Sequence, residues 1–174
     1  MAQYKIDQSH SDITFKVKHL MISTVTGTFS SFDSSFQSEA SDFSDAKISF
    51  EADIESISTN NEQRDGHLKS ADFFDAANHP KLVFTAGGMT KTGDNQYEIH
   101  GDMNIRGTVK PVTLKAEYLG KMTDFYGNEK HGFEISGKIN RKEFGLSWDA
   151  ITEAGGVVVS DEVKLAVNAQ FQKI

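Results

Sequence analysis

The amino-acid sequence predicts an all-β fold, an eight-stranded antiparallel β-barrel with a short helical insertion around residues 60–75. Apolar and polar residues alternate over segments of strand length, and Gly, Asp, Asn and Ser separate these segments. No helical pattern alternates with the strands, so a parallel sheet is not expected. Antiparallel strands that share one apolar face can close into a barrel, which removes exposed sheet edges. A two-sheet sandwich is the alternative that the alternation leaves open.

The N-terminal part of the chain contains the first three expected strands, at residues 13–17, 25–36 and 46–54. Side chains two residues apart point the same way, so the first strand places three apolar residues on one face, Ile13, Phe15 and Val17. The second strand changes phase after Phe29, which indicates a β-bulge near Ser30. The third has one unbroken apolar face, made of Ile48, Phe50, Ala52 and Ile54.

A helical insertion is expected after the third strand, where the alternation stops. Thr59 and Glu62 have the spacing of a capping box, in which their side-chain oxygens accept hydrogen bonds from backbone N–H groups at the start of a helix. The sequence therefore predicts a helix over about residues 60–69 and a further turn to residue 75. Pro80 ends the insertion, because proline disfavours a helical conformation at the preceding residue.

The remaining strands are expected at residues 82–86, 97–105, 112–118, 133–139 and 163–171. Gly87 and Gly88 are expected to break the chain after the first of these. Three glycines occupy apolar positions inside strands, Gly27, Gly101 and Gly137. A packed sandwich would favour side chains there, so these glycines favour a barrel with space inside it. They are equally consistent with bends at barrel corners.

The composition limits the function classes. The 174 residues are expected to form one domain, 1–174. A formal net charge of −7 and the lack of a Lys/Arg cluster argue against nucleic acid as a partner. The longest aliphatic run, Val157–Val159, is far too short to span a membrane. The chain has no cysteine but 13 phenylalanines, whose apolar rings must be buried by the protein or by a ligand.

Residues that could carry chemistry are scattered along the chain. The six histidines include no pair at metal-ligand spacing, so neither a metal site nor a cofactor is expected. His10, Ser11 and Asp12 are consecutive and cannot adopt the geometry of a catalytic triad. Arg64 and Asp65 are adjacent on the expected helix, where neighbouring side chains point in different directions. The sequence therefore suggests no catalytic residue.

Apolar residues that could line a cavity are concentrated. The residues on the inward-facing side of the strands are expected to line a tunnel: Phe15, Val17, Phe29, Phe50, Ile54, Leu82, Phe84, Ile99, Met103, Phe133 and Val167. The insertion and the segment 141–148 are expected to supply its mouth or lid, with Leu68, Phe73, Phe74, Phe144 and Trp148. A polar head group of the ligand would meet a polar residue near one end: His19, Arg64, Asp65 or Arg141.

A series of motifs occurs in an order that is specific when taken together: Asp7–Ser11, Phe15–Leu20, Val25–Phe29, Ser56–Asn60, Arg64–Leu68, Phe73–Asp75, Gly101–Gly107, Arg141–Gly145 and Ser160–Val163. In these motifs, and over nearly the whole chain, the sequence resembles the YceI-like polyisoprenoid-binding family. The resemblance implies an elongated, lipocalin-like barrel that holds a prenyl chain or another long amphiphile, often in a homodimer. It implies no established enzymatic activity.

The resemblance also bears on location, because many members of the family are exported to the periplasm. The start of this sequence, Met1–Lys5, lacks the apolar segment of a secretory signal. The cytoplasm is therefore expected for the sequence as it stands, and the periplasm if a signal has been removed.

The function expected from these observations is binding of a polyisoprenoid, an isoprenoid quinone or a fatty-acid derivative inside the barrel, for transport, storage or sequestration. Two alternatives belong to other classes. An enzyme acting on a small hydrophobic substrate would need a polar residue with a perturbed pKa inside the barrel, and the inward phases contain almost none. A stress or interaction protein would fill the barrel with its own side chains and act through its surface.

Overall fold

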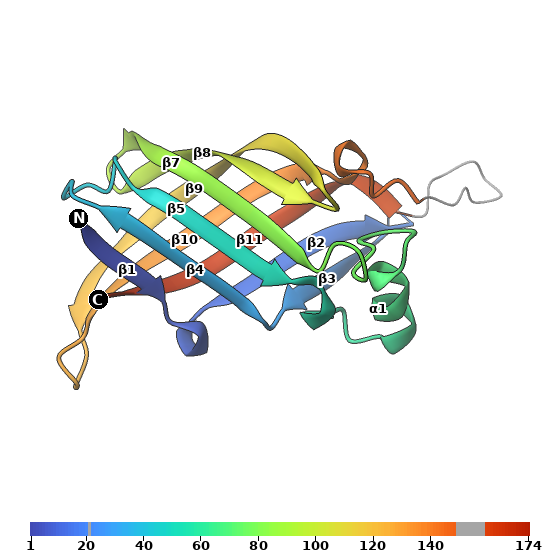
Figure 1. Ribbon diagram of the computed structural model, residues 1–174, viewed down its shortest axis with the longest axis horizontal. Coiled ribbons are helices and arrows are strands. Elements are labelled where there is room, and N and C mark those ends of the chain that lie inside the picture. Colours follow the sequence, from blue (N-terminus) through green and yellow to red (C-terminus); the bar gives the residue numbers. More distant parts are fainter. Residues whose placement is uncertain (21, 149–158) are drawn as a thin grey trace.

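The strands of the protein close into an antiparallel barrel (Figure 1). The computed structural model describes residues 1–20, 22–148 and 159–174. Eight strands form the barrel in the order β1-β4-β5-β7-β8-β9-β10-β11, and β11 pairs with β1 to close it. Their bounds are β1 Ala2–Ile6, β4 Phe32–Ser38, β5 Lys47–Asp53, β7 Lys81–Gly93, β8 Gln96–Ile105, β9 Thr108–Thr123, β10 Glu129–Asn140 and β11 Val159–Lys173. The prediction of an eight-stranded antiparallel barrel is confirmed.

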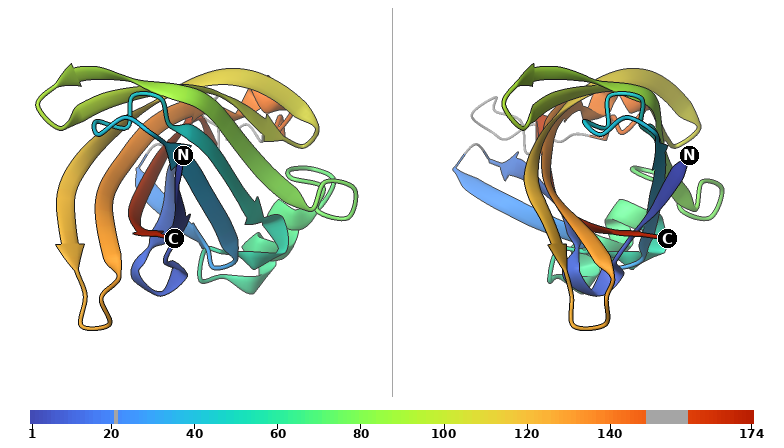
Figure 2. Two further views of the ribbon diagram at one scale, coloured as in Figure 1. Left: turned by 60° about the vertical axis from the view of Figure 1, so that its left-hand side comes forward. Right: turned by 90° about the vertical axis from the view of Figure 1, so that its left-hand side faces the viewer.

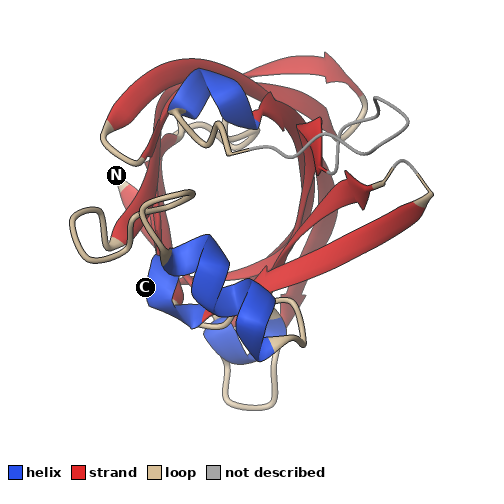
Figure 3. Ribbon diagram, turned by 90° about the vertical axis from the view of Figure 1, so that its right-hand side faces the viewer, coloured by secondary structure: helices blue, strands red, loops and turns tan. Residues whose placement is uncertain are grey.

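Three more strands extend the sheet: β2 Asp12–His19, β3 Ser23–Phe29 and β6 Ile57–Ser58. They are attached through β11, which pairs with β1 at residues 171–173 and with β2 at residues 159–168. β3 pairs with β2, and β6 pairs with β3. The β2–β3 hairpin lies at the end of the barrel that carries the helix α1, Glu62–Lys69 (Figures 1 and 3).

The division into strands differs from the prediction in three places. The expected strand 25–36 is split at Ser30–Ser31 into β3 and β4, which pair with different neighbours. β1 is absent from the prediction, because its five residues are too few for alternation to stand out. Gly87 and Gly88 lie inside β7 rather than ending it, since the register with β8 shifts there and the strand absorbs a bulge.

The helix α1 begins later than the capping-box pattern predicts. Asn61 is its N-cap, and the Asn61 side-chain oxygen accepts a hydrogen bond from the backbone N–H of Arg64 at 3.0 Å. Thr59 instead donates its hydroxyl to Asp65 and accepts a hydrogen bond from Arg64 Nε at 2.8 Å. Asn60 has a left-handed φ of 61°, which separates Thr59 from the helix. The capping box is therefore wrong, while a helix within residues 60–69 is confirmed.

Glycines inside the strands make room for large neighbouring side chains. A Cβ atom added to Gly27 would lie 2.1 Å from Phe15 Cζ, the terminal ring atom of the residue paired with it across the sheet. A Cβ atom on Gly101 would lie 2.5 Å from Phe84 Cζ, and one on Gly137 would lie 2.4 Å from Leu114 Cδ2. Each glycine therefore lets a neighbouring side chain lie flat on the barrel wall, as aromatic residues do over glycine in other sheets.

Replacing Gly27 with alanine should destabilise the barrel by about 1–3 kcal/mol, because the Phe15 ring must leave its rotamer to admit the new methyl group. Urea unfolding followed by circular dichroism measures the effect. Gly66 is the control, since nothing lies within 4 Å of an added Cβ atom there. Alanine at Gly66, inside α1, should stabilise by up to about 1 kcal/mol. A Gly27→Ala variant as stable as the wild type would contradict the close packing.

An ionic cluster at Asp7 fixes the connection between β1 and β2. Asp7 precedes the 3₁₀ turn η1, Gln8–His10, and accepts a hydrogen bond from the backbone N–H of Ser9 at 3.1 Å. Asp7 Oδ2 also lies 2.8 Å from Lys130 Nζ on β10 and 2.7 Å from His10 Nδ1. The hydrogen bond from Lys130 is the largest cause that holds the pKa of Asp7 well below its usual range. The cluster therefore ties η1 to β10, which is separated from β1 by β11 in the barrel.

Replacing Asp7 with asparagine should lower the free energy of unfolding at neutral pH by roughly 1.5–3 kcal/mol, the usual contribution of hydrogen bonds to a charged group. The folded-state pKa of Asp7 is lowered, so its contribution is complete above the unfolded-state pKa of about 4 and declines as the pH falls below it. Urea unfolding of both proteins at neutral and acid pH should show a difference that shrinks on acidification. A difference that does not depend on pH would contradict this role of the carboxylate.

Candidate functional site

A cavity runs through the interior of the barrel, and apolar side chains form nearly all of its wall. Every barrel strand contributes to the wall, which also includes Ile13 and Phe15 from β2 and Phe29 from β3. Nine of the eleven residues predicted from the sequence to line a tunnel lie in this wall: Phe15, Phe29, Phe50, Leu82, Phe84, Ile99, Met103, Phe133 and Val167.

The cavity is narrow, because its volume is about 120 Å³ although its lining on β11 extends from Leu165 to Phe171. Several large side chains that line it are only half-buried, although they lie on the inner face of the barrel: Ile48, Phe50, Leu82, Ile135, Leu165 and Val167. The side chains of the described residues therefore do not fill the barrel completely.

Two residues predicted to line the tunnel lie outside its wall. Val17 is half-buried near the end of β2, where it pairs with Val25 and Val163 beyond the cavity. Ile54 begins the 3₁₀ turn η2, Ile54–Ser56, and is packed into the core with 2% exposure. At Val17 the alternation continues although β2 has already left the cavity. At Ile54 it continues although β5 has already ended.

Sequence reasoning missed part of the wall. Ile6 and Phe36 were missed because β1 was not recognised and because the bulge before β4 obscured the phase of that strand. The sequence did place several others on apolar strand faces without assigning them to the tunnel: Ile135, Leu165, Ala169 and Phe171. Extending the alternation to whole strands would have found these residues.

Seven rings close the end of the barrel at which the chain termini lie, and we call this cluster the aromatic plug: Tyr4, Phe36, Phe43, Tyr118, His131, Phe133 and Phe171. Phe36 is stacked on Tyr4 with centroids 4.5 Å apart and meets Phe171 at 5.0 Å. Phe43 comes from the loop between β4 and β5, which lies at this rim in Figure 2. All seven rings except Tyr118 are buried.

A chain of hydrogen bonds supports the rings of the plug from behind. Tyr118 Oη lies 2.8 Å from His131 Nδ1, and His131 Nε2 lies 3.0 Å from Glu129 Oε2. Burial raises the pKa of the Tyr118 hydroxyl, and the hydrogen bond to His131 lowers the pKa of Glu129. A tyrosine with a raised pKa stays protonated at neutral pH and so cannot act as a base, and none of the three residues lines the cavity. The chain therefore orients rings and does not present an activated group to a ligand.

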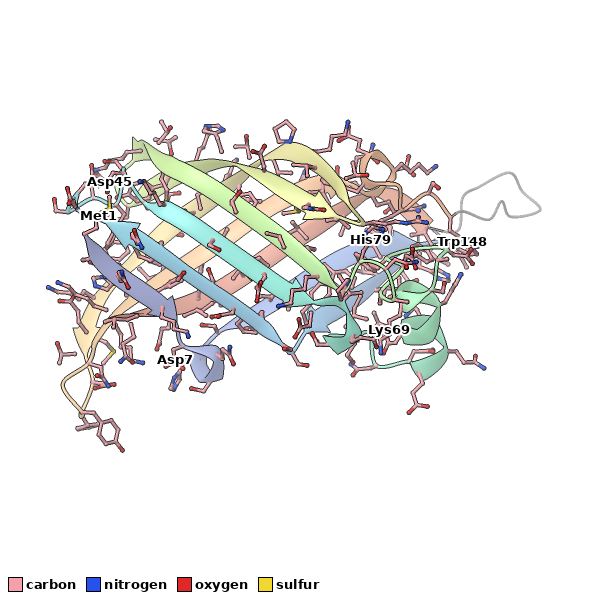
Figure 4. All side chains as sticks on the ribbon, viewed as in Figure 1. Met1, Asp7, Asp45, Lys69, His79 and Trp148 are labelled. Carbon is pink, nitrogen blue, oxygen red and sulfur yellow. The ribbon has the colours of Figure 1, made fainter. Side chains whose placement is uncertain are left out.

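At the opposite end of the barrel, next to α1, the described residues include apolar side chains that are only half-buried. Phe73 is buried and packs with His67 at 5.1 Å, and His67 packs with Trp148 at 4.8 Å. Phe74 and Leu68 are half-buried, as is Trp148, and the Phe74 ring lies 6.4 Å from that of the cavity residue Phe29. Figure 4 labels Trp148 and Lys69 at this end. Four of the five residues predicted for the mouth lie here.

The fifth predicted mouth residue, Phe144, lies in the core. It ends the 3₁₀ turn η3, Arg141–Phe144, and is 1% exposed. Arg141 in the same turn is 2% exposed and donates hydrogen bonds to the carbonyl oxygens of Leu146 at 2.6 Å and Trp148 at 2.7 Å. The guanidinium group of Arg141 therefore holds the segment after η3 in place.

The remaining polar residues predicted to contact a head group also have local roles. Arg64 Nη2 donates to the carbonyl oxygen of Thr59 at 2.8 Å, and Asp65 accepts from the backbone N–H of Thr59 at 2.8 Å. His19 is the half-buried last residue of β2. Within the described ranges, no buried side-chain polar atom lacks a hydrogen-bond partner. The structure thus brings most of the predicted apolar residues together at one cavity, and the predicted polar residues His19, Arg64, Asp65 and Arg141 are not among the described residues that line it.

The described residues include no group of three or more His, Asp or Glu side chains that could hold a metal ion. No helix in this part of the chain is long and apolar enough to cross a lipid bilayer.

Comparison with known proteins places the barrel in a family. The model of the YceI-like domain matches residues 4–171. The chain belongs to the YceI-like family. A UPF0312 protein of Staphylococcus epidermidis is 36% identical over 172 residues, which cover 98% of each chain. Protein YceI of Escherichia coli O157:H7 is 38% identical over 150 residues, which cover 85% of this chain and 78% of that protein.

Solved structures with the same fold include members of the YceI-like family. The YceI protein of Campylobacter jejuni is 31% identical and superposes with a TM-score of 0.76 over 90% of both chains. A polyisoprenoid binding domain from Saccharophagus degradans superposes with a TM-score of 0.68 over 98% of both chains at 13% identity. The second likeness shows a shared fold. The relatives named here are bacterial proteins.

Proposed function

We propose that this YceI-like protein binds one long apolar or amphiphilic molecule inside the barrel and carries, stores or sequesters it. The ligand classes are a polyisoprenoid, an isoprenoid quinone or a fatty-acid derivative. The observation that carries the proposal is the narrow apolar cavity, whose wall leaves large side chains such as Phe50 and Leu82 half-buried. A chain-shaped apolar ligand would cover these surfaces and remove them from water.

The energetics of burial agree with tight binding. A chain that buries on the order of 500 Å² of apolar surface gains roughly 12 kcal/mol at about 25 cal/mol per Å². Loss of translational freedom and ordering of the chain offset several kcal/mol of this, which leaves an affinity in the micromolar to nanomolar range. Such binding requires no polar contact along the chain. It therefore agrees with a cavity wall in which the polar side chains are few.

The ligand would enter the cavity at the end of the barrel next to α1. Leu68, Phe74 and Trp148 are half-buried there and pack against the core from the outside. Phe74 contacts Phe29, so a small displacement of the insertion would lead directly to the cavity. The other end is closed by the aromatic plug. We assign the polar head of the ligand to the α1 end, where it would remain in contact with water.

Replacing Phe84 with aspartate should abolish uptake of a fluorescent fatty acid or prenol, because a carboxylate in the apolar wall is costly to bury next to the chain. The matched control is Thr85→Asp, since Thr85 is the next residue of β7 and is exposed on the outer face. Circular dichroism checks folding. Leu82→Gln, a milder change at a half-buried wall position, tests the same point if Phe84→Asp unfolds. Unchanged uptake in folded Phe84→Asp would exclude Phe84 from the binding site.

One further experiment identifies the ligand and distinguishes a carrier from an enzyme and from a protein that acts through its surface. Native mass spectrometry of protein purified from its own host, followed by organic extraction, identifies the bound molecule. A stoichiometric prenyl or acyl lipid that is recovered unchanged after incubation supports a carrier. Chemical conversion of that lipid would favour the enzyme instead. A barrel that stays empty and takes up no lipid when challenged would favour a surface role.

We also infer that the protein forms a homodimer, and exposed apolar residues on the β9–β10 hairpin support this. Phe125 is 105% exposed at the tip and Tyr126 is 91% exposed. Leu119 and Met122 on the same hairpin are also exposed. The hairpin extends beyond the barrel wall at the lower left of Figure 1. Apolar side chains that are gathered and exposed in this way are typical of contact surfaces.

Light scattering coupled to size-exclusion chromatography tests the dimer. The wild type should have the mass of two chains, and a Phe125→Asp/Tyr126→Asp double variant should have the mass of one, because the charges cannot be buried in an apolar contact. Lipid uptake by the double variant should be retained, since both residues lie outside the cavity wall. A monomeric wild type at micromolar concentration would exclude the dimer.

A further inference from the structure

The structure points to a limit on the length of the ligand: the tail enters from the α1 end and stops against the aromatic plug. The surfaces that stop it are the rings of Phe36, Phe133 and Phe171. This inference rests on the proposed function, because it requires an apolar chain in the cavity. It adds a property that an apolar tunnel alone does not have, which is discrimination by chain length.

The wall of the cavity ends within the plug. Phe36, Phe133 and Phe171 line the cavity, whereas the plug residues Tyr4 and Tyr118 do not. The plug therefore has two layers, one ring layer that faces the cavity and a second layer behind it. A chain that reaches the first layer finds buried aromatic packing and no further space.

The two layers are interlocked, so the floor of the cavity is rigid. The Phe36 ring meets that of Phe133 at 6.1 Å, and the Phe133 ring meets that of Phe171 at 6.0 Å. Behind them, the Phe43 ring lies 5.8 Å from Phe133 and 5.5 Å from Phe36. A ring in such a close-packed interior can move aside only if its neighbours also move. Beside α1, the described rings include the half-buried Phe74 and Trp148, whereas every ring of the plug except Tyr118 is buried.

Small side chains line the cavity beside this floor: Ala46 before β5, Ala116 on β9 and Ala169 on β11. Ala169 pairs with Phe133 across the sheet and precedes Phe171 by two residues, so the two share the inner face of β11. Along the inner face of β11, the side chain thus changes from the methyl group of Ala169 to the benzyl group of Phe171, the next inward-facing residue.

The same strand indicates the depth of the cavity. The lining residues of β11 extend from Leu165 to Phe171. At about 3.3 Å per residue this stretch is roughly 20 Å long before the tilt of the strand is taken into account. Such a depth accommodates an alkyl tail lying along the wall. Each methylene that enters should raise the affinity about fourfold, and methylenes beyond the floor should add nothing.

The experiment measures the affinity of saturated straight-chain fatty acids that differ in length by two carbons. Below the limit, the logarithm of the affinity should rise linearly with length, and above it the curve should level off or fall. Replacing Phe171 or Phe36 with alanine should move the break to longer chains by roughly two to four carbons, because neighbouring rings relax only partly into the new space. Ala169→Leu should move it to shorter chains.

Two controls separate a length limit from general damage. Ala166→Leu makes the same substitution on the exposed face of β11 and should leave the break unchanged. Phe74→Ala, at the α1 end, should change the affinity for all lengths by a similar factor and leave the break in place. If Phe171→Ala and Phe36→Ala do not fold, Phe171→Leu and Ala169→Leu still predict shifts in opposite directions.

The outcomes distinguish this inference from the proposed function. Opposite shifts in Ala169→Leu and in the variants of Phe171 or Phe36 establish the plug as the length limit. An affinity that rises without a break, or a break that is the same in every folded variant, overturns the limit while leaving the carrier function intact. A wild-type protein that binds no chain of any length overturns both.

Discussion

Closure of the barrel depends on the length of β11. One edge of this strand pairs with β10 along residues 162–172, while the other edge pairs first with β2 and then with β1. A shorter final strand would pair with only one of them, and either the barrel would stay open or the β2–β3 hairpin would lose its attachment. Because antiparallel pairing fixes which side chains point inward, this closure also decides which apolar residues face the cavity.

The two ends of the barrel differ because different parts of the chain cover them. At the end with the termini, strands and a short loop supply rings that pack directly on one another. At the other end, the described residues that form the cover include α1 and residues 145–148, which are attached by the hydrogen bonds of Arg64 and Arg141. Packed rings resist local opening more than a short helix attached by its ends. One end is therefore suited to close the cavity and the other to admit a ligand.

The fold and much of the cavity wall could be predicted from the sequence because long strands alternate clearly. Phe84, Ile99 and Met103 were placed correctly because each lies well inside an unbroken run of alternation. Features that depend on contacts through space could not be predicted in this way. The plug joins Tyr4, Phe43 and Phe171 from distant parts of the chain, and no local pattern links them. The helix start was missed because the left-handed conformation of Asn60 overrides the capping pattern.

The unfilled cavity has a consequence for the lifetime of the protein in the cell. Half-buried residues such as Ile48 and Leu165 pack against the core on one side and leave apolar surface exposed to the cavity, so a bound chain would supply further stabilising contacts. A ligand that binds only the folded state adds stability in proportion to the logarithm of its concentration. Proteases degrade the unfolded fraction, and that fraction shrinks as the ligand accumulates. The steady-state amount of such a carrier would then follow its lipid supply without a separate regulator.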